Sequence, residues 1–280
     1  MIQTGEVFLA DTHVHSRFSH DSEARISDIC KAAREKHIGA VCITDHADIK
    51  PHTDMEEQLR IRKDVALTVA KEKENPDGVE LLLGIELACG GFYPQNDIFD
   101  RVADTLLTVG SLDCVIGSVH SVGAISTARN NYAQMNKGEL LGCMDRYFDA
   151  VLAMLEYGQP DVLAHLTYPL RYINGKFERG LNWQDLEPKI KQILSWIIDK
   201  HIALEINTSC LGTYYDALMP DKDILRLYRQ MGGTLLTLGS DAHKPENLAK
   251  GFQQTVAWLK TQNVTQLQYV KNRQFHPYQI

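Results

Sequence analysis

His13 and His15 stand two residues apart and directly follow a short apolar run near the start of this 280-residue chain. On an extended chain, side chains at this spacing point to the same face, so both imidazoles could bind one metal ion. A lone pair of this kind is a weak signal, because surface or core histidines produce it about as often. The pattern elsewhere in the chain must decide between the two interpretations.

The same residue types follow other strand-like runs. Five segments place a histidine or an acid at such an end: Thr44-Asp45-His46, Gly84-Ile85-Glu86, Gly117-Ser118-Val119-His120, Leu163-Ala164-His165 and Asp241-Ala242-His243. Together with His13 and His15, six of the eleven histidines occupy such positions, which chance would not easily arrange. Imidazole and carboxylate together suit zinc, manganese or iron, and the chain has no Cys-x-x-Cys pair that would indicate a structural zinc site.

This set of candidate ligands is too large for one ion. At roughly four to six ligands per metal, with some carboxylates bridging, it fits two or three divalent ions. Clustered metals make a bound water far more acidic, so a shared hydroxide is a nucleophile at neutral pH. The predicted chemistry is therefore hydrolysis.

Seven short apolar runs indicate buried parallel strands that would carry these residues. They cover residues 7–11, 40–45, 79–85, 114–119, 162–165, 203–207 and 234–239. Helical periodicity appears between them, most clearly over residues 138–156 and again from Leu186 to Ile197. Turn signals at Gly39, residues 75–78 and residues 232–233 agree with these boundaries.

Strict alternation of strands and helices predicts a parallel α/β sheet, either closed into a barrel or doubly wound. A doubly wound sheet binds ligands at one switch point, whereas nearly every strand here ends in a candidate ligand, so closure is favoured. Catalytic residues of a barrel gather at the C-terminal ends of its strands. Residues 1–280 show no linker or internal repeat, so we expect a single domain.

The composition excludes several classes of protein. A formal net charge of -7 disfavours a nucleic-acid partner bound through its phosphates. No apolar run approaches the roughly 20 residues that cross a bilayer, and the first residues lack the pattern of a signal peptide. We therefore expect a cytoplasmic protein with no membrane partner, whose oligomeric state the sequence leaves open.

Taken together, the motifs resemble the PHP (polymerase and histidinol phosphatase) superfamily and, within it, the PHP-type histidinol-phosphate phosphatases. The resemblance covers essentially the whole chain. It rests on His13-x-His15 with the segment from Ser16 to Glu23, on Thr44-Asp45-His46, Gly84-Ile85-Glu86, Gly117-Ser118-Val119-His120, the segment from His165 to Tyr172, Glu205-Ile206-Asn207-Thr208-Ser209 and Gly239-Ser240-Asp241-Ala242-His243.

The resemblance implies a distorted (β/α)7 TIM-like barrel, the PHP fold, with a trinuclear metal site. Carried over by position, the ligands would be His13, His15, Asp21, His46, Glu86, His120, His165, Asp241 and His243. Some members use histidine at the place of Asp21, and His20 is adjacent. The spacing from His15 favours Asp21, which leaves His20 as a substrate contact or a bystander.

The resemblance also implies that Arg171 binds the substrate phosphate, since a planar guanidinium can hold two oxygens. Many members place an arginine or another polar residue shortly after Asn-Thr-Ser, whereas this chain reads Cys210-Leu211-Gly212. A second contact is then missing or comes from elsewhere, with Arg17 as a candidate. Asp11 and Asp45 adjoin ligand histidines and would orient them, or act as weak ligands.

The activity implied is that of a histidinol-phosphatase, a metal-dependent phosphoric monoester hydrolase of histidine biosynthesis that acts by metal-activated hydroxide on a small phosphomonoester. Asp241 or His243 would protonate the leaving group. The substrate amine needs an acceptor, for which the loop after the second strand offers Asp48, Asp54, Glu56 and Glu57, although a helix start explains the last three equally well. Residues 121–137 would be a lid or a surface excursion.

Three alternatives remain at this point. One is a PHP phosphoesterase that acts on nucleotides or other small phosphomonoesters. A deaminase or amide hydrolase on a similar barrel is disfavoured, because no lysine ends a predicted strand. A degenerate, non-catalytic PHP domain is disfavoured because all the ligand positions are filled.

Overall fold

The structure is a computed structural model that describes residues 8–49, 53–74, 78–89, 111–123 and 125–280. Its centre is a sheet of parallel strands in the order β1-β2-β4-β5-β8-β9-β10. These strands span Ala10–Val14 (β1), Ala40–Ile43 (β2), Glu80–Cys89 (β4), Cys114–Ser118 (β5), Val162–Leu163 (β8), Ala203–Asn207 (β9) and Leu236–Gly239 (β10). Most of their side chains are buried, which explains why the strands appear in the sequence as continuous apolar runs.

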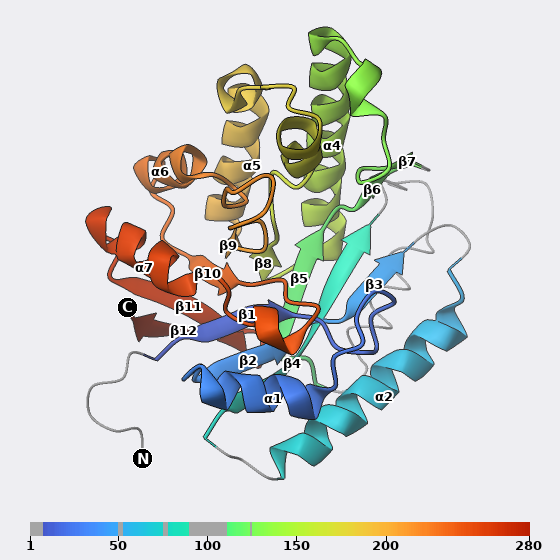
Figure 1. The fold of residues 1–280 in the computed structure, drawn as a ribbon, viewed down its shortest axis with the longest axis vertical. Coiled ribbons are helices and arrows are strands. Elements are labelled where there is room, and N and C mark those ends of the chain that lie inside the picture. The colour runs from blue at the N-terminus through green and yellow to red at the C-terminus, as the bar shows by residue number, and fades with distance from the viewer. Residues whose placement is uncertain (1–7, 50–52, 75–77, 90–110, 124) are drawn as a thin grey trace.

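The two edges of this sheet meet, so the strands form a nearly closed barrel (Figure 1). Val14 of β1 forms a parallel bridge with Ala242, which follows β10. The backbone N–H of Asp241 donates to the carbonyl of His13 over 2.8 Å, and that of His15 donates to the carbonyl of Ala242 over 2.9 Å. The predicted α/β fold, a distorted (β/α)7 TIM-like barrel, is confirmed.

Helices surround the barrel, as Figure 1 shows. They are α1 (Ile26–Glu35), α2 (Met55–Lys73), α4 (Lys137–Gly158), α5 (Glu187–Asp199), α6 (Lys222–Gln230) and α7 (Phe252–Thr261). Shorter turns are the 3-10 helices η1 (Tyr132–Gln134), η3 (Trp183–Leu186) and η4 (Pro245–Asn247) and the π-helical segment η2 (Arg171–Lys176).

The helix predicted over residues 138–156 corresponds to α4. It begins with a capping box, in which Asn136 accepts from the N–H of Glu139 and the Glu139 carboxylate accepts from the N–H of Asn136. The residues that gave the periodicity are largely buried against the barrel, Met144 and Phe148 completely. The helix ends before Gln159, whose left-handed backbone precedes Pro160.

Most of the predicted strand ranges differ by a few residues from the strands of the structure. The first strand runs from Ala10 to Val14 rather than over 7–11, of which Val7 lies outside the described residues, so His13 lies within the strand. The second ends at Ile43, and pairing with β4 resumes in a separate strand, β3 (His46–Ile49). Side chains of the two intervening residues bond to the first strand and its loop, which explains the break.

Two hairpins were not predicted. One joins β6 (Ser121–Val122) to β7 (Ile125–Ser126) beyond the end of β5. The other joins β11 (Gln266–Lys271) to β12 (Gln274–Gln279) at the C-terminus. Its turn places Asn272 and Arg273 in the left-handed region, at φ 51° and 60°, without a glycine to signal it.

The C-terminal hairpin packs against the N-terminal ends of the barrel strands. Tyr269 Oη donates to Glu80 at the start of β4 over 3.0 Å, and Lys271 Nζ donates to the same carboxylate over 2.5 Å. The N–H of Asn272 donates to Asp113 before β5 over 3.1 Å. Arg273 Nε lies 2.6 Å from the carboxylate of Asp161 before β8. This hairpin therefore ties together one end of the barrel.

In the parts of the chain that the structure describes, no helix has the length and apolar character required to span a bilayer. The cytoplasmic location and the single domain of residues 1–280 stay predictions.

Candidate metal and phosphate site

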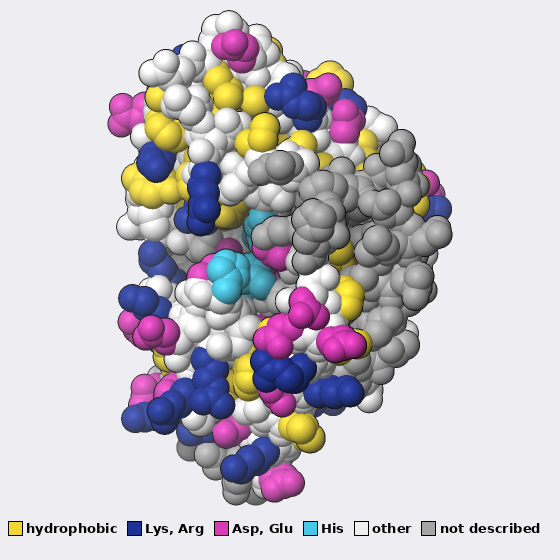
Figure 2. Space-filling view, turned by 90° about the vertical axis from the view of Figure 1, so that its right-hand side faces the viewer, with side chains coloured by type: hydrophobic (Ala, Val, Ile, Leu, Met, Phe, Trp, Pro, Cys, Tyr) yellow, Lys and Arg dark blue, Asp and Glu magenta, His cyan; other side chains and the backbone are white. Residues whose placement is uncertain are grey.

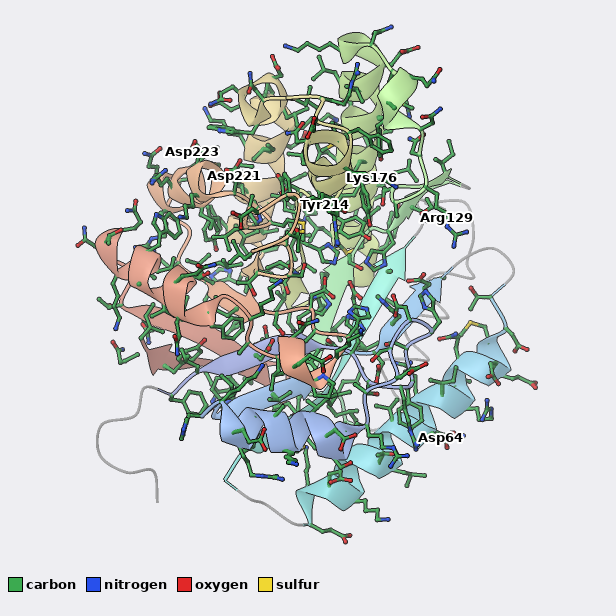
Figure 3. The ribbon with its side chains drawn as sticks, in the orientation of Figure 1. Asp64, Arg129, Lys176, Tyr214, Asp221 and Asp223 are labelled. Carbon is green, nitrogen blue, oxygen red and sulfur yellow. The ribbon has the colours of Figure 1, made fainter. Side chains whose placement is uncertain are left out.

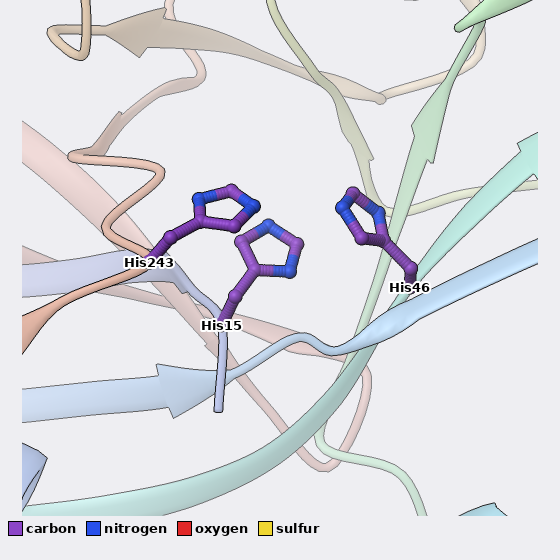
Figure 4. A group of neighbouring side chains, drawn as sticks. All are labelled: His15, His46 and His243. Atoms are coloured by element: carbon purple, nitrogen blue, oxygen red, sulfur yellow. The ribbon is translucent and has the colours of Figure 1, made fainter. Parts of the chain in front are cut away.

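The structure brings all nine candidate ligands together at the C-terminal ends of the barrel strands. Among the described residues, five triads have ligand atoms within 4.8 Å of one another: His15/His46/His243, His13/His15/Asp241, His13/Glu86/His165, His20/Asp21/His46 and His46/Glu86/His120. The triads share members, so they form one continuous cluster. Figure 4 shows the rings of His15, His46 and His243 gathered in it; the ring of His15 lies 4.2 Å from each of the other two.

Glu86 is the central carboxylate of the cluster. It is fully buried, and its oxygens lie 2.6 Å from His46 Nδ1, 3.2 Å from His120 Nε2 and 3.0 Å from His165 Nε2. Burial alone would raise the pKa of this carboxyl group, but the surrounding imidazoles, His120 foremost, hold the pKa of Glu86 well below its usual range. Glu86 is therefore ionised and able to bridge cations.

His13, His15 and Asp241 form a second part of the cluster. The Nε2 atoms of His13 and His15 face each other at 3.1 Å, and Asp241 Oδ1 lies 3.3 Å from His15 Nε2. Burial and the neighbouring His46 lower the pKa of His15 to about 3, so its imidazole is neutral and keeps a lone pair for a ligand bond. Burial also lowers the pKa of His13, but nearby carboxylates outweigh it and raise that pKa well above its usual value.

Asp21 and His20 compete for one position of the cluster. Asp21 Oδ1 lies 3.4 Å from His46 Nε2 and 3.3 Å from His243 Nε2, whereas His20 Nε2 lies 4.0 Å from the Asp21 carboxylate and the His20 ring centre lies 5.3 Å from that of His46. The His20 side chain is 72% exposed. The geometry favours Asp21 as the ligand and leaves His20 at the rim.

Glu205 orients two of the histidines, a role that the sequence analysis missed. Its Oε1 accepts from His13 Nδ1 at 2.6 Å, which turns Nε2 of that ring toward the cluster, and its Oε2 accepts from the N–H of His165 at 2.8 Å. A Cβ at Gly239 would collide with the Glu205 carboxylate, so glycine is required there. The signal in the sequence is a buried glutamate between Leu204 and Ile206 in strand β9.

Asp45 and Asp11 form hydrogen bonds that orient the candidate ligands or the backbone beside them. This arrangement agrees with the interpretation that they orient ligands rather than bind metal themselves. Asp45 accepts from Ser19 Oγ at 2.6 Å, and Ser19 Oγ lies 3.1 Å from His15 Nδ1, so a chain of hydrogen bonds orients that ring. Asp11 accepts from the N–H and hydroxyl of Ser240, which fixes the segment before Asp241. Burial raises the pKa of Asp11 to about 6.

The backbone is strained at two candidate ligands. His165 and Asp241 have φ values of 26° and 52°, in the region that residues other than glycine rarely adopt. Each is held there by a hydrogen bond from its own N–H, to Glu205 and to the carbonyl of His13 respectively. Strain of this kind persists where the surrounding structure fixes a functional geometry.

The residues present fit divalent metal ions. All the clustered donors are imidazole nitrogens or carboxylate oxygens, the set that zinc, manganese and iron accept. His165 Nδ1 is buried and, within the described part of the chain, has no hydrogen-bond partner. Glu86 Oε2 and His46 Nδ1 lie 2.6 Å apart without hydrogen-bond geometry, which leaves both available to a cation. The cluster is therefore a divalent-metal site.

A cavity of about 1020 Å³ lies above the cluster, and Figure 2 shows histidines and acidic side chains at the bottom of the corresponding hollow. Arg171 lines this cavity, with its guanidinium 5.4 Å from the ring centre of Tyr168 and 5.3 Å from that of Tyr172. Stacking on these rings holds the guanidinium in place. The position predicted for a phosphate-binding cation thus lies beside the cluster.

Several other candidates are not brought to this cavity. Arg17 is exposed, with its guanidinium 5.3 Å from the ring centre of Phe18, and is not among the described residues that line the cavity. Asp54 caps α2 by accepting from the N–H of Glu57, and Glu56 and Glu57 lie in the first turn of that helix. Of the four acids considered for the substrate amine, Asp48 is the one found among the described residues that line the cavity.

Part of the segment 121–137 does border the cavity. Ser121, Gly123, Ser126, Ala128 and Arg129 contribute to its lining. The segment is therefore a wall of the mouth rather than a distant excursion. Arg129 was not singled out from the sequence, because nothing in its local pattern distinguishes it from a surface arginine.

A PHP domain model matches residues 11–209. The chain belongs to the PHP domain family. Among curated proteins it is 28% identical over 260 residues to a probable histidinol-phosphatase of Clostridium acetobutylicum, covering 91% of this chain and 94% of that protein. It is also 28% identical over 255 residues to a probable histidinol-phosphatase of Thermotoga maritima, with 91% and 93% covered.

A third relative is the histidinol-phosphatase of Lactococcus lactis, 26% identical over 247 residues, with 83% of each chain covered. Among solved structures, the histidinol phosphate phosphatase of Lactococcus lactis, complexed with zinc, L-histidinol and phosphate, superimposes with a TM-score of 0.76 at 22% identity. That superposition covers 97% of this chain and 100% of the other. It supports the PHP barrel as the fold.

Proposed function

We propose that this protein is a histidinol-phosphatase that hydrolyses L-histidinol phosphate to L-histidinol and phosphate. The observation that carries the proposal is the presence of the complete imidazole and carboxylate cluster in a chain whose full-length relatives bear that name. The substrate class is a small phosphomonoester. A cavity beside a cationic guanidinium suits such an anion.

The cluster would hold two or three divalent ions, zinc, manganese or iron, through His13, His15, Asp21, His46, Glu86, His120, His165, Asp241 and His243. When bound, such ions supply an activated water nucleophile and neutralise negative charge on the phosphoryl oxygens. The chain contributes orientation: Glu205 and the Ser19–Asp45 pair fix the rings of His13 and His15.

Arg171 would hold the phosphate beside the cluster, so that the nucleophile and the leaving oxygen lie in line on opposite sides of phosphorus. Its guanidinium stacks on Tyr168 and Tyr172, so little side-chain freedom is lost on binding. Of the two predicted proton donors, His243 would protonate the leaving alkoxide: burial alone would raise the pKa of Asp241, but the neighbouring imidazoles, His13 foremost, hold it well below its usual range, so that carboxylate carries no proton. His243 Nδ1 donates to the backbone carbonyl of Asp241 at 2.9 Å, which leaves its Nε2 for the cavity. His20 at the rim would contact the substrate.

The amine of histidinol needs an acceptor, and Asp48 on β3 would provide it. Its Oδ1 lies 3.5 Å from His120 Nδ1, and its side chain is 23% exposed on the cavity wall. The acidic balance of the chain disfavours a nucleic-acid partner. A second candidate is a phosphatase for other small phosphomonoesters, favoured by 24% identity over 238 residues to a probable phosphatase of Photobacterium profundum.

Phosphate release from L-histidinol phosphate tests the proposal directly. The metal-free protein is loaded with manganese, zinc or iron, and kcat/KM is compared with that for a panel of nucleotides and sugar phosphates. A preference of about 100-fold or more for L-histidinol phosphate is expected, because it corresponds to only about 2.7 kcal/mol of binding energy in the transition state. Equal activity across the panel would favour the second candidate.

A further inference from the structure

Two arginines line the cavity above the cluster, and they come from different elements. Arg171 begins the π-helical segment η2, whereas Arg129 follows the hairpin of β6 and β7. Figure 3 shows Arg129 extending from that segment. We propose that Arg129 is a second phosphate-binding residue, which captures the phosphate group of the substrate at the mouth. This inference rests on the proposed phosphatase function.

The two arginines differ in how they are held. Arg171 is partly buried and stacked between two tyrosine rings. Arg129 is exposed, and within the described residues its guanidinium has no ion pair or hydrogen bond, although Asp21 and Asp48 line the same cavity. All the donors of Arg129 are therefore available to an incoming anion.

Many exposed arginines only interact with water, and Arg129 differs from them in the way its segment is held beside the cluster. Its backbone N–H donates to the carbonyl of Ser126 at 3.2 Å. Thr127 donates from its hydroxyl and from its N–H to the carbonyl of His120, at 2.8 and 3.1 Å. The segment that bears Arg129 is thus fastened to the backbone of a candidate metal ligand, which fixes the base of the arginine beside the cluster.

The charge of the molecule gives Arg129 a specific role. The chain carries a formal charge of -7, and three of the residues lining the cavity are aspartates, Asp21, Asp48 and Asp241. The bound divalent ions would attract a phosphomonoester dianion to the bottom of the cavity, and a cation at the mouth would offset the aspartates along its path. Arg129 supplies that cation and holds the bound phosphate from the side of the rim, while Arg171 holds the same phosphate from deeper in the cavity.

The expected kinetic signature is an effect on KM rather than on kcat. Arg129→Ala should raise KM for L-histidinol phosphate about 10-fold and leave kcat within about twofold, because the lost contact is made in the ground state as well as in the transition state. Arg129→Lys keeps the charge without the planar fork and should raise KM only about threefold. The alanine variant should also weaken the dependence of kcat/KM on ionic strength.

A matched control is Arg226→Ala on α6, which changes the net charge equally. Arg226 is exposed and pairs with Asp223, and α6 lies on the opposite side of Figure 1 from β6 and β7. The second readout is calorimetric binding of inorganic phosphate to the manganese-loaded protein. We expect Arg129→Ala to weaken this binding about 10-fold and Arg226→Ala to leave it unchanged.

Unchanged KM and unchanged phosphate affinity in Arg129→Ala would overturn the inference, as would equal effects in the Arg226→Ala control. The proposed function fails separately, if the wild-type protein does not hydrolyse L-histidinol phosphate. In that case phosphate binding still tests Arg129 on its own. A loss of phosphate affinity confined to Arg129→Ala supports its role as an anion contact, and an unchanged affinity would exclude that role.

Discussion

The two ends of the barrel treat their charged side chains in opposite ways. At the N-terminal ends of the strands, Glu80 and Asp113 accept from donors on the C-terminal hairpin, and Asp161 forms an ion pair with Arg273 of that hairpin. At the C-terminal ends, groups of the same kind face each other: the Nε2 atoms of His13 and His15 lie 3.1 Å apart. In the first arrangement, other groups of the chain compensate the charge of the carboxylates. In the second, several metal-ligand atoms point at one another, and a bound cation would satisfy them together.

The difference separates stability from function. Acids that pair with donors or cations of the same chain stabilise the fold, because their charges are compensated inside the molecule. Clustered imidazoles and carboxylates with strained backbone at His165 and Asp241 reduce stability in exchange for a ligand site. Substitutions at the two ends should therefore produce opposite phenotypes.

The largest effect is expected at the centre of the mouth, where Glu86→Gln should lower kcat by about 10³-fold, or about 4 kcal/mol. The substitution removes the buried charge that faces His46, His120 and His165. The measurement is phosphate release at saturating substrate. Glu80→Gln makes the same change at the other end of β4 and should leave kcat unchanged. A Glu86→Gln enzyme with more than a tenth of the wild-type rate would contradict the assigned role.

A smaller loss is expected for Glu205→Gln, because Glu205 orients His13 and would not itself touch the metal. Metal affinity should fall about 10- to 100-fold, the usual cost of removing a carboxylate behind a ligand histidine. Activity measured against manganese concentration gives the midpoint, which should shift while the rate at saturating metal largely recovers. An unshifted midpoint would show that Glu205 does not affect metal binding and contributes only to the fold.

The smallest effect belongs to the N-terminal end. Arg273→Ala should lower the free energy of unfolding by about 2 kcal/mol, since it leaves the mostly buried Asp161 carboxylate without its cation. Urea unfolding measures this, with Arg25→Ala as a control that should unfold like wild type, because the Arg25 side chain is exposed and caps nothing at the start of α1. The kcat value should not change. A loss of activity in folded Arg273→Ala would show that the two ends are coupled.

The barrel could be predicted from the sequence because its strands are short apolar runs buried on both faces. The C-terminal hairpin could not, since its turn adopts positive φ at Asn272 and Arg273 without glycine or a matching apolar alternation. The pairing with β4 stops at the end of β2 and resumes at β3. This interruption depends on hydrogen bonds of Thr44 and Asp45 to the neighbouring strand and its loop. Such long-range contacts leave no mark on the local sequence.

Candidate ligands at strand ends could be predicted for a similar reason, because parallel strands bring their C-terminal ends to one mouth. The supporting residues were harder to find. Glu205 was quoted within a motif without a role, and its function depends on the distance to a strand almost two hundred residues away. Arg17 was the candidate for a second phosphate contact and Arg129 was not considered, whereas the segment after β7 contributes to the cavity wall.

The most direct test of the account is a metal titration of the activity. Metal-free protein is mixed with increasing equivalents of manganese, and phosphate release from L-histidinol phosphate is recorded at each step. The account predicts no activity without metal and a rise that ends at two or three equivalents per chain. Activity that does not depend on metal, or no turnover of L-histidinol phosphate at any loading, would contradict it.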